Sequence, residues 1–457
     1  MRRAFTLVLV SALAGCAGPR PAPPIAAALS APAAWRDGPG AGDAVEADWW
    51  RAFGDPVLTA MVETALAGNV DVALAASRVE EARAQFRLAG AQRQPNLTGS
   101  AAGGRERSIN PAFGVASEQT AGQGQLSVSY DLDLFGRLAQ ASQAARAAML
   151  ATEAARDNVR LAVAAAAAQG YIGLRAQDAR LAVLKDTLTA RETSLRLARR
   201  RAEAGYASQL DLRQAEAEYH ATEQLIPAAE LAISRQEDGL SLLLGESPRA
   251  IQRGLELDVL EPPAVPAGLP AALLRRRPDI VQAEQQLVAA DRSLDAVRAA
   301  FLPDVRLTAE GGAVVSSLLQ NDPIGVYSIG GGLLTPLLDG GRLRAQQGVA
   351  AARRDQAAFA YRKAALTAFR EVEDALATVT RTAEQEQALV AQRDALASAL
   401  RQATNRYRAG YSAYLEQIDA QRGLLAAELA LVQARADRLS AAVTLRQALG
   451  GGWSPSS

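Results

Sequence analysis

The chain has 457 residues, of which 49 are basic and 49 acidic, so its formal net charge is zero. No basic excess points to nucleic acid, and no charged tail points to a polyelectrolyte partner. A single histidine (His220) and a single cysteine (Cys16) exclude a disulfide within the chain and leave almost nothing for a His-based catalytic site or a Cys/His metal cluster.

The N-terminus has the pattern of a lipoprotein signal peptide. Two arginines precede an apolar stretch, residues 4–14, which is too short to span a bilayer comfortably. The tetrad Leu13-Ala14-Gly15-Cys16 resembles a bacterial lipobox, in which cleavage precedes the cysteine. We expect residues 1–15 to be the signal peptide and Cys16 to carry a diacylglycerol and an N-acyl chain. Ala17 in the next position favours the outer membrane, by resemblance to sorted lipoproteins. A simple secretory signal with a chance cysteine is the alternative.

Residues 16–40 are rich in proline and alanine and predict a lipidated tether, because this composition cannot pack a core. No later segment offers some 20 uninterrupted apolar residues. Any passage through a membrane must therefore use strands, closed into a barrel so that no edge stays unpaired.

Two segments alternate apolar and polar residues with the period of a β-strand, residues 125–134 and 304–315. Their apolar positions are Leu126, Val128, Tyr130 and Leu132, then Val305, Leu307 and Ala309. The polar and Gly-rich stretches 108–120 and 316–325 predict the turns at the strand tips. The alternation fits a barrel with lipid outside and water inside, and it fits a half-buried soluble sheet equally well. We expect four strands per chain, too few to close a useful barrel, so several chains would share one.

Residues 138–204 predict a single long helix of roughly 100 Å. Leu181, Leu184, Leu188 and Leu195 follow a heptad-like spacing along it, so the helix needs partner helices along its length. An ordinary coiled coil is the alternative that this periodicity leaves open.

A sharp helix break follows at Gly205, in AEAGYASQLDLRQAEAE, and a second one follows 205 positions later at Gly410, in RAGYSAYLEQIDAQRGLL. Other landmarks keep a similar spacing: Arg137 with Arg342, Gly245 with Gly450, Asp71 with Asp279, and Pro95 with Pro303. We therefore expect two tandem structural repeats. Residues 41–250 would hold a belt helix, a helix, two strands, a long helix and a helix. Residues 251–270 would be a Pro-rich belt linker, and residues 271–457 would hold a helix, two strands, a long helix, a helix and a short tail.

Several motifs in this order resemble the outer-membrane efflux protein family, TolC-like channels, and their lipoprotein subgroup in particular. They are ADWWRAFGDPVLTAMVETALAGN (47–69), GLPAALLRRRPDI (268–280), TPLLDGGRL (335–343), YLEQIDAQR (414–422) and ALGGGW (448–453). The resemblance implies a mainly α-helical protein with a membrane β part. Three chains would form a 12-stranded β-barrel that continues into a long α-helical barrel, with a belt around its middle. It also implies a non-enzymatic channel in the outer membrane of a Gram-negative bacterium that conducts drugs or other small toxic compounds passively, with no cofactor. A periplasmic adaptor and an inner-membrane pump would be its partners.

The resemblance also places two sites. The breaks would lie at the tunnel tip, where Gly205, Tyr206, Gly410 and Tyr411 would contact the adaptor. Ser208 with Asp211 predicts a capping box that restarts the helix after the first break. After the second break, Leu415, Asp419 and Arg422 lie at spacings that put them on one helix face, and we expect them to constrict the channel. Arg422, or Arg213 of a neighbouring helix, would neutralise Asp419, and Asp211 would lie at the same aperture.

The sequence is also compatible with other functions. A duct for protein secretion or for heavy metals would use the same architecture, although three methionines offer no thioether-rich path. A periplasmic coiled-coil adaptor would need a soluble β-domain between its helices, which the sequence lacks. An enzyme that uses carboxylates such as Asp211 or Asp419 would need a paired acid in an evident pocket.

Overall fold

The computed structural model describes residues 19–36, 45–110, 112, 114–264, 270–318 and 323–453. The predicted signal peptide, the lipidation site Cys16 and parts of both predicted linkers lie outside these residues. The elements are, in chain order, η1 (Ile25–Ala27), η2 (Trp49–Phe53), α2 (Pro56–Gly68), α3 (Val70–Ala91), β1 (Asn96–Asn110), β2 (Val115–Asp131), α4 (Arg137–Glu203), α5 (Gln209–Glu223), α6 (Leu225–Leu243), α7 (Pro270–Arg276), α8 (Pro278–Ala299), β3 (Asp304–Ser316), β4 (Ile324–Leu334), α9 (Arg342–Ala409) and α10 (Tyr414–Ala448). Two compact units share these elements, and α3, α4, α8 and α9 each contribute residues to both units.

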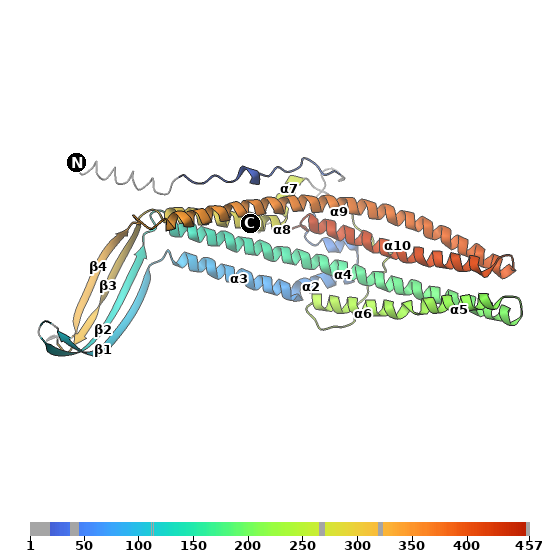
Figure 1. Ribbon diagram of the computed structural model, residues 1–457, viewed down its shortest axis with the longest axis horizontal. Coiled ribbons are helices and arrows are strands. Elements are labelled where there is room, and N and C mark those ends of the chain that lie inside the picture. The colour runs from blue at the N-terminus through green and yellow to red at the C-terminus, as the bar shows by residue number, and fades with distance from the viewer. Residues whose placement is uncertain are drawn as a thin grey trace. The chain divides into compact units, whose positions relative to one another are not determined.

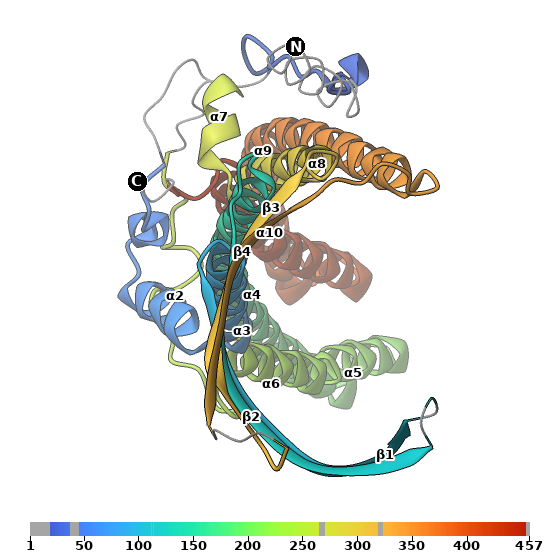
Figure 2. The ribbon, with the colours of Figure 1, turned by 90° about the vertical axis from the view of Figure 1, so that its left-hand side faces the viewer.

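The first unit contains one antiparallel sheet in the order β1-β2-β3-β4, a single curved layer in Figure 2. The register places apolar residues opposite one another on neighbouring strands. Leu97 pairs with Val128, Val128 with Ala309, and Ala309 with Ile329. Cross-strand partners share a face, so these four residues form an apolar row across the whole sheet. The next row is polar and contains Thr98, Ser127, Glu310 and Ser328. The predicted alternation is confirmed, and the apolar face is uncovered in this chain: Leu97, Leu126 and Ile329 are all exposed.

The first turn of the sheet is shorter than expected. Residues 108–120 were predicted to be a turn, but β1 extends to Asn110 and β2 begins at Val115. Serine, glycine and glutamine are poor strand formers by intrinsic preference, yet each strand here has a paired neighbour that satisfies its backbone groups. The second predicted turn agrees with the gap between β3 and β4 to within two residues.

The N-terminal segment that begins the described chain is held on the first unit through Arg20, Pro21 and Ala22. Arg354 of α9, only 2% exposed, donates to the carbonyl oxygens of Pro21 and Ala22 at 3.1 and 3.0 Å. Arg20 forms salt bridges to Asp291 and Asp295 of α8 at 2.8 and 3.0 Å. The start of the described part of the predicted tether, Arg20 to Ala22, thus has a defined seat, although the composition of the tether could not build a core.

The second unit is helical, and its core lies where η2 and α2 pack against the middle of α4 and the end of α10. Trp49, Leu58, Tyr171 and Leu439 are fully buried there. α5 and α6 follow one another beside α4, and α10 runs beside α9 (Figure 1). The helix expected after the first break is in fact two helices. Pro227, near the start of α6, has no N–H to donate to the Glu223 carbonyl. The helix is therefore interrupted at Gln224, between α5 and α6.

Within the described residues no single helix is long and apolar enough to cross a membrane. The bent pair α2 and α3 passes that criterion only when its two helices are taken together.

Candidate functional site

The two helix breaks are built in the same way. Gly205 and Gly410 have φ angles of +75° and +83°, the left-handed conformation that ends a helix without a steric cost at glycine. The amide of Tyr206 donates to the Arg201 carbonyl at 2.8 Å, and the amide of Tyr411 donates to the Arg406 carbonyl at 2.9 Å. Both tyrosines are about four-fifths exposed. The predicted tip residues therefore occupy equivalent, accessible positions.

The two restarts differ in their caps. Ser208 accepts a hydrogen bond from the Asp211 amide at 3.1 Å, so the serine half of the predicted capping box is confirmed. At the second restart the capping position is Ala413, which has no side-chain acceptor. The Ser412 hydroxyl beside it is buried and has no hydrogen-bond partner among the described residues. The helix that follows the second break therefore lacks the side-chain cap that stabilises the helix after the first break.

The predicted aperture residues share one side of α10. Leu415, Asp419 and Arg422 are exposed, whereas Tyr414, Gln417, Ile418 and Gln421 on the other side are buried. The spacing argument from the sequence is therefore correct about the face.

The expected pairs with Asp419 are not formed as hydrogen bonds or salt bridges among the described residues, although the negative charge of Asp419 contributes to the raised pKa of Arg422. Arg422 donates to the Glu218 carboxylate of α5, through Nε at 2.9 Å and also through Nη2, and not to Asp419. Arg213 pairs with Glu216, three residues further along its own helix, at 2.7 Å. No salt bridge to Asp419 or Asp211 is formed in the part of the chain that the structure describes. A charged side chain on a helix can pair with a residue on a neighbouring helix or with a residue three or four positions away on its own helix. The sequence pattern reveals only pairs within one helix.

Glu218 is the centre of this contact, and the sequence pattern did not identify it as a site residue. Its side chain is 8% exposed, and its carboxylate also forms a salt bridge to the buried Arg191 of α4 at 3.0 Å. Arg191 donates further to the Thr222 hydroxyl at 2.6 Å. Burial lowers the pKa of Arg191, opposed by the negative charge of Glu218. The hydrogen bond and charge of Glu218 raise the pKa of Arg422. One carboxylate thus joins α4, α5 and α10.

Two amides extend the polar contact. Gln417 and Gln421 of α10 both donate to the Ser194 hydroxyl of α4, at 3.2 and 3.0 Å. At the ends of the long helices, Arg201 of α4 donates to the Tyr407 carbonyl of α9 at 2.7 Å, with its guanidinium over the Tyr407 ring. Polar contacts at several positions along the helices therefore join α4 and α5 to α9 and α10. Sequence spacing could not find these contacts, because their partners lie some 200 positions apart.

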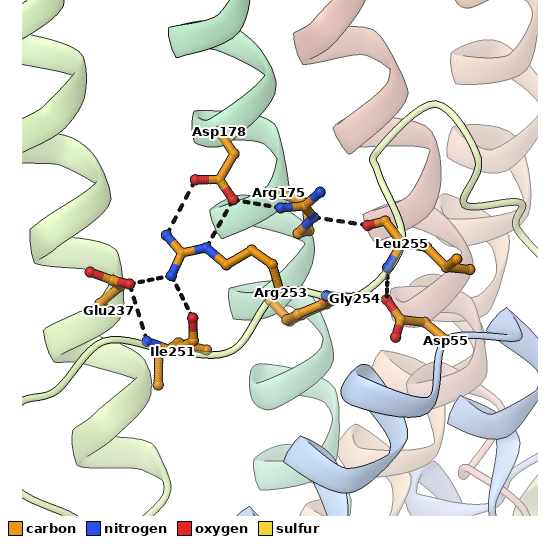
Figure 3. A network of polar contacts seen from close by, with 9 residues as sticks. Asp55, Arg175, Asp178, Glu237, Ile251, Arg253, Gly254 and Leu255 are labelled. Carbon is orange, nitrogen blue, oxygen red and sulfur yellow. Dashed lines mark hydrogen bonds and ion pairs between the residues drawn. The ribbon is translucent and has the colours of Figure 1, made fainter.

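The linker after α6 is fixed by a second polar network (Figure 3). Arg253 forms a bidentate pair with Asp178 of α4 at 3.1 and 3.2 Å and also donates to Glu237 of α6. Arg175 joins Asp178 to the Leu255 carbonyl, at 2.7 and 2.9 Å. The linker thereby ties α4 to α6, which gives the expected belt a rigid attachment.

Asp55 anchors the same linker to α2. It is 1% exposed and accepts from the amides of Val57 and Leu255 at 2.8 and 3.0 Å and from the Tyr171 hydroxyl at 2.7 Å. Gly254 lies so close that a Cβ atom there would be 2.3 Å from an Asp55 oxygen. The sequence signal for Asp55 was its position before Pro56, where a helix N-cap is common.

Comparisons with known proteins agree with this architecture. The family model described as "Outer membrane efflux protein" matches residues 61–246 and 269–451. The chain is 35% identical over 422 residues to the probable efflux pump outer membrane protein TtgC of Pseudomonas putida, covering 90% of this chain and 86% of that protein. It is 33% identical over 413 residues to the cation efflux system protein CusC of Escherichia coli, covering 89% and 88%.

The fold has solved counterparts. The open state of the Neisseria gonorrhoeae MtrE outer membrane channel superposes with a TM-score of 0.84 at 28% identity, covering 95% of this chain and 98% of that one. Sequence match, element order and fold thus agree. The chain belongs to the outer membrane efflux protein family, whose members are channels in the outer membrane of Gram-negative bacteria that extend through the periplasm.

Proposed function

We propose that this chain is the exit duct of a tripartite efflux system and that it conducts small toxic compounds passively across the outer membrane. The observation that carries the proposal is the sheet of the first unit. It has one uncovered apolar face and two edges, β1 and β4, that pair with no further strand among the described residues. Such edges are satisfied when β4 of one copy pairs with β1 of the next. Three copies would then close a barrel of 12 strands, and each chain would contribute two tandem repeats.

The constriction lies, in this proposal, on the exposed face of α10. Threefold symmetry turns Leu415 into an apolar collar and Asp419 into a ring of like charges. Arg422, held by Glu218, keeps α10 against α5. Opening requires α10 to move away, so this contact must be released. Arg213 and Asp211 on α5 border the same space, with Arg213 held by its own helix.

The adaptor would dock on the breaks. Gly205 and Gly410 keep the backbone accessible, and Tyr206 and Tyr411 can bury a ring while the hydroxyl stays solvated. An adaptor and an inner-membrane pump are the partners proposed, because relatives carry the names of efflux pump components.

A lipid on Cys16 would place the N-terminus at the membrane. Arg20 is seated on α8 at Asp295, four residues before that helix ends at Ala299, and β3 begins at Asp304. The four residues from Cys16 to Arg20 reach about 14 Å when extended. That length suffices for acyl chains on Cys16 to enter the inner leaflet near the base of the strands.

The cargo proposed is drugs or organic toxicants, as in the names of the pseudomonad relatives; heavy metals and secreted protein are the alternatives. No group of three or more metal-ligating side chains occurs among the described residues. The test is expression of the chain, with the adaptor and pump encoded beside its gene, in a host that lacks its own channel. Drug resistance and lower accumulation of a fluorescent efflux substrate are expected. A channel that inserts and trimerises, yet restores resistance to neither organic toxicants nor copper, would overturn the proposal.

A further inference from the structure

A buried polar layer lies between α4 and α10. It consists of Ser194, Gln417 and Gln421, and we refer to it as the Ser194 layer. The two glutamines lie one turn apart on α10, and both Nε2 groups donate to the Ser194 hydroxyl, at 3.2 and 3.0 Å. The hydroxyl donates its own proton to the Ala190 carbonyl at 3.1 Å. Ser194 therefore uses its one donor and both of its acceptor sites.

The two glutamine amides are only partly satisfied. The Oε1 atoms of Gln417 and Gln421 are buried and have no hydrogen-bond partner among the described residues. Ser194 supplies no donor to them, because its proton is donated to Ala190. A buried acceptor without a donor carries a desolvation cost, which disappears when water reaches the atom. At this layer, packing α10 against α4 is therefore less favourable than it would be between apolar side chains.

The contacts on the two sides of the Ser194 layer are better satisfied. Toward the breaks, Leu195 of α4 and Ile418 of α10 belong to one apolar cluster. Farther from the breaks, Glu218 joins the buried Arg191 to Arg422. The partly satisfied layer thus lies directly beside the contact that must be released when α10 moves.

We propose that the Ser194 layer sets how readily α10 separates from α4, so that its three residues are positioning residues of the channel gate. This inference rests on the proposed function, in which opening requires α10 to move away. When α10 separates, water satisfies the two Oε1 atoms that lack a donor in the packed arrangement. The layer therefore favours opening, whereas the apolar cluster and the Glu218 contact oppose it.

Two variants distinguish this role from a structural one, because they remove the same hydrogen bonds with opposite consequences. Ser194→Ala leaves both Nε2 donors unpaired in addition to the Oε1 atoms. It should raise the fraction of time that the channel is open by about tenfold. The triple variant Ser194→Ala, Gln417→Met, Gln421→Met fills the layer with apolar groups of similar shape. It should lower the open fraction below that of wild type and raise the melting temperature.

The open fraction is measured by single-channel recording of the purified full chain in planar bilayers, with thermal unfolding in detergent alongside. Gln433→Met is the matched control, because Gln433 is an exposed glutamine of α10 that bonds to Asp437 one turn further along. It should change neither the open fraction nor the melting temperature. A layer that only holds the helices together would move Ser194→Ala and the triple variant in the same direction.

An open fraction in Ser194→Ala equal to that of wild type would overturn the proposal, and so would a triple variant that opens as often as wild type or more often. If Ser194→Ala does not fold, the triple variant alone decides, because lost contacts could not lower its open fraction. A wild-type chain that forms no pore would overturn the proposed function and this inference with it. A wild-type pore that both variants leave unchanged would refute this inference alone.

Discussion

Arg422 on α10 is bound to Glu218 on α5, so the helix that follows the second break is attached to the helix that follows the first. The two partners differ in exposure: the Arg422 side chain is 60% exposed and that of Glu218 is 8% exposed. Because Glu218 also holds the buried Arg191, the contact with Arg422 can open without leaving a buried charge unpaired. A contact of this kind suits a gate better than a wholly buried pair.

Arg422→Ala should raise the single-channel conductance in planar bilayers, because it frees α10 from α5. The loss of stability should be about 1 kcal/mol or less, since one partner is exposed. Arg370→Ala is the matched control: it removes an exposed arginine pair within α9 and should leave conductance unchanged. Equal conductance in Arg422→Ala and wild type would place the gate elsewhere.

Gly410→Trp should abolish drug resistance while trimers still form, because it alters the surface on which the adaptor would dock. Tyr411→Ala removes an exposed ring without changing the backbone and should act in the same direction. Gly239→Trp, at an exposed helical glycine away from both breaks, controls for bulk alone. Normal resistance in cells with well-expressed Gly410→Trp and Tyr411→Ala channels would show that the breaks do not contact the adaptor.

Gly254→Ala should destabilise the second unit, because the added methyl group collides with the Asp55 carboxylate. We expect a loss of about 1–3 kcal/mol, the range for overpacking a closely packed site. Gly239→Ala meets nothing within 4 Å and should be neutral or stabilising by up to about 1 kcal/mol. Thermal unfolding in detergent compares the two, and an equal melting temperature would contradict the role assigned to Asp55.

Lowering the pH should weaken the attachment of the linker, because Glu237 becomes protonated. Burial alone would raise the pKa of this carboxyl, but hydrogen bonds from Arg253 and the Ile251 amide, with the charge of Arg253, outweigh burial and lower the pKa below its ordinary value of 4.5. The contribution of Glu237 to stability is therefore complete above pH 4.5 and is lost as the pH falls toward the lowered value. Glu237→Gln should be less stable than wild type near neutral pH, with a smaller further loss in acid. Parallel pH profiles for the two proteins would refute this.

Cys16→Ala should abolish incorporation of radiolabelled fatty acid, and the mature chain should lose its lipid anchor. Wild type is the positive control, and Arg20→Ala should keep the label while it frees the seated segment from Asp291 and Asp295. Label retained by Cys16→Ala would end the lipoprotein interpretation.

The sequence by itself determined most elements and their order, although it did not separate α5 from α6. The long helix predicted at 138–204 is observed at Arg137–Glu203, and both breaks occur at the predicted glycines. These features depend on local chemistry: helical periodicity, a left-handed glycine, a serine that caps the next amide. Strand alternation was equally visible, and so was the shared exposed face of Leu415, Asp419 and Arg422, since each needs only the geometry of one element.

Only the tertiary structure decided which charges meet. Arg422 has Asp419 within one turn in the sequence, yet it binds Glu218, 204 positions away. The seat of the tether on Arg354, the attachment of the linker through Arg253 and the choice of Asp55 as an anchor have the same origin. An ion pair forms where packing brings two groups together out of water, and packing between distant helices is set by their apolar faces. The sequence records the faces, but it does not state which polar residues those faces bring opposite one another.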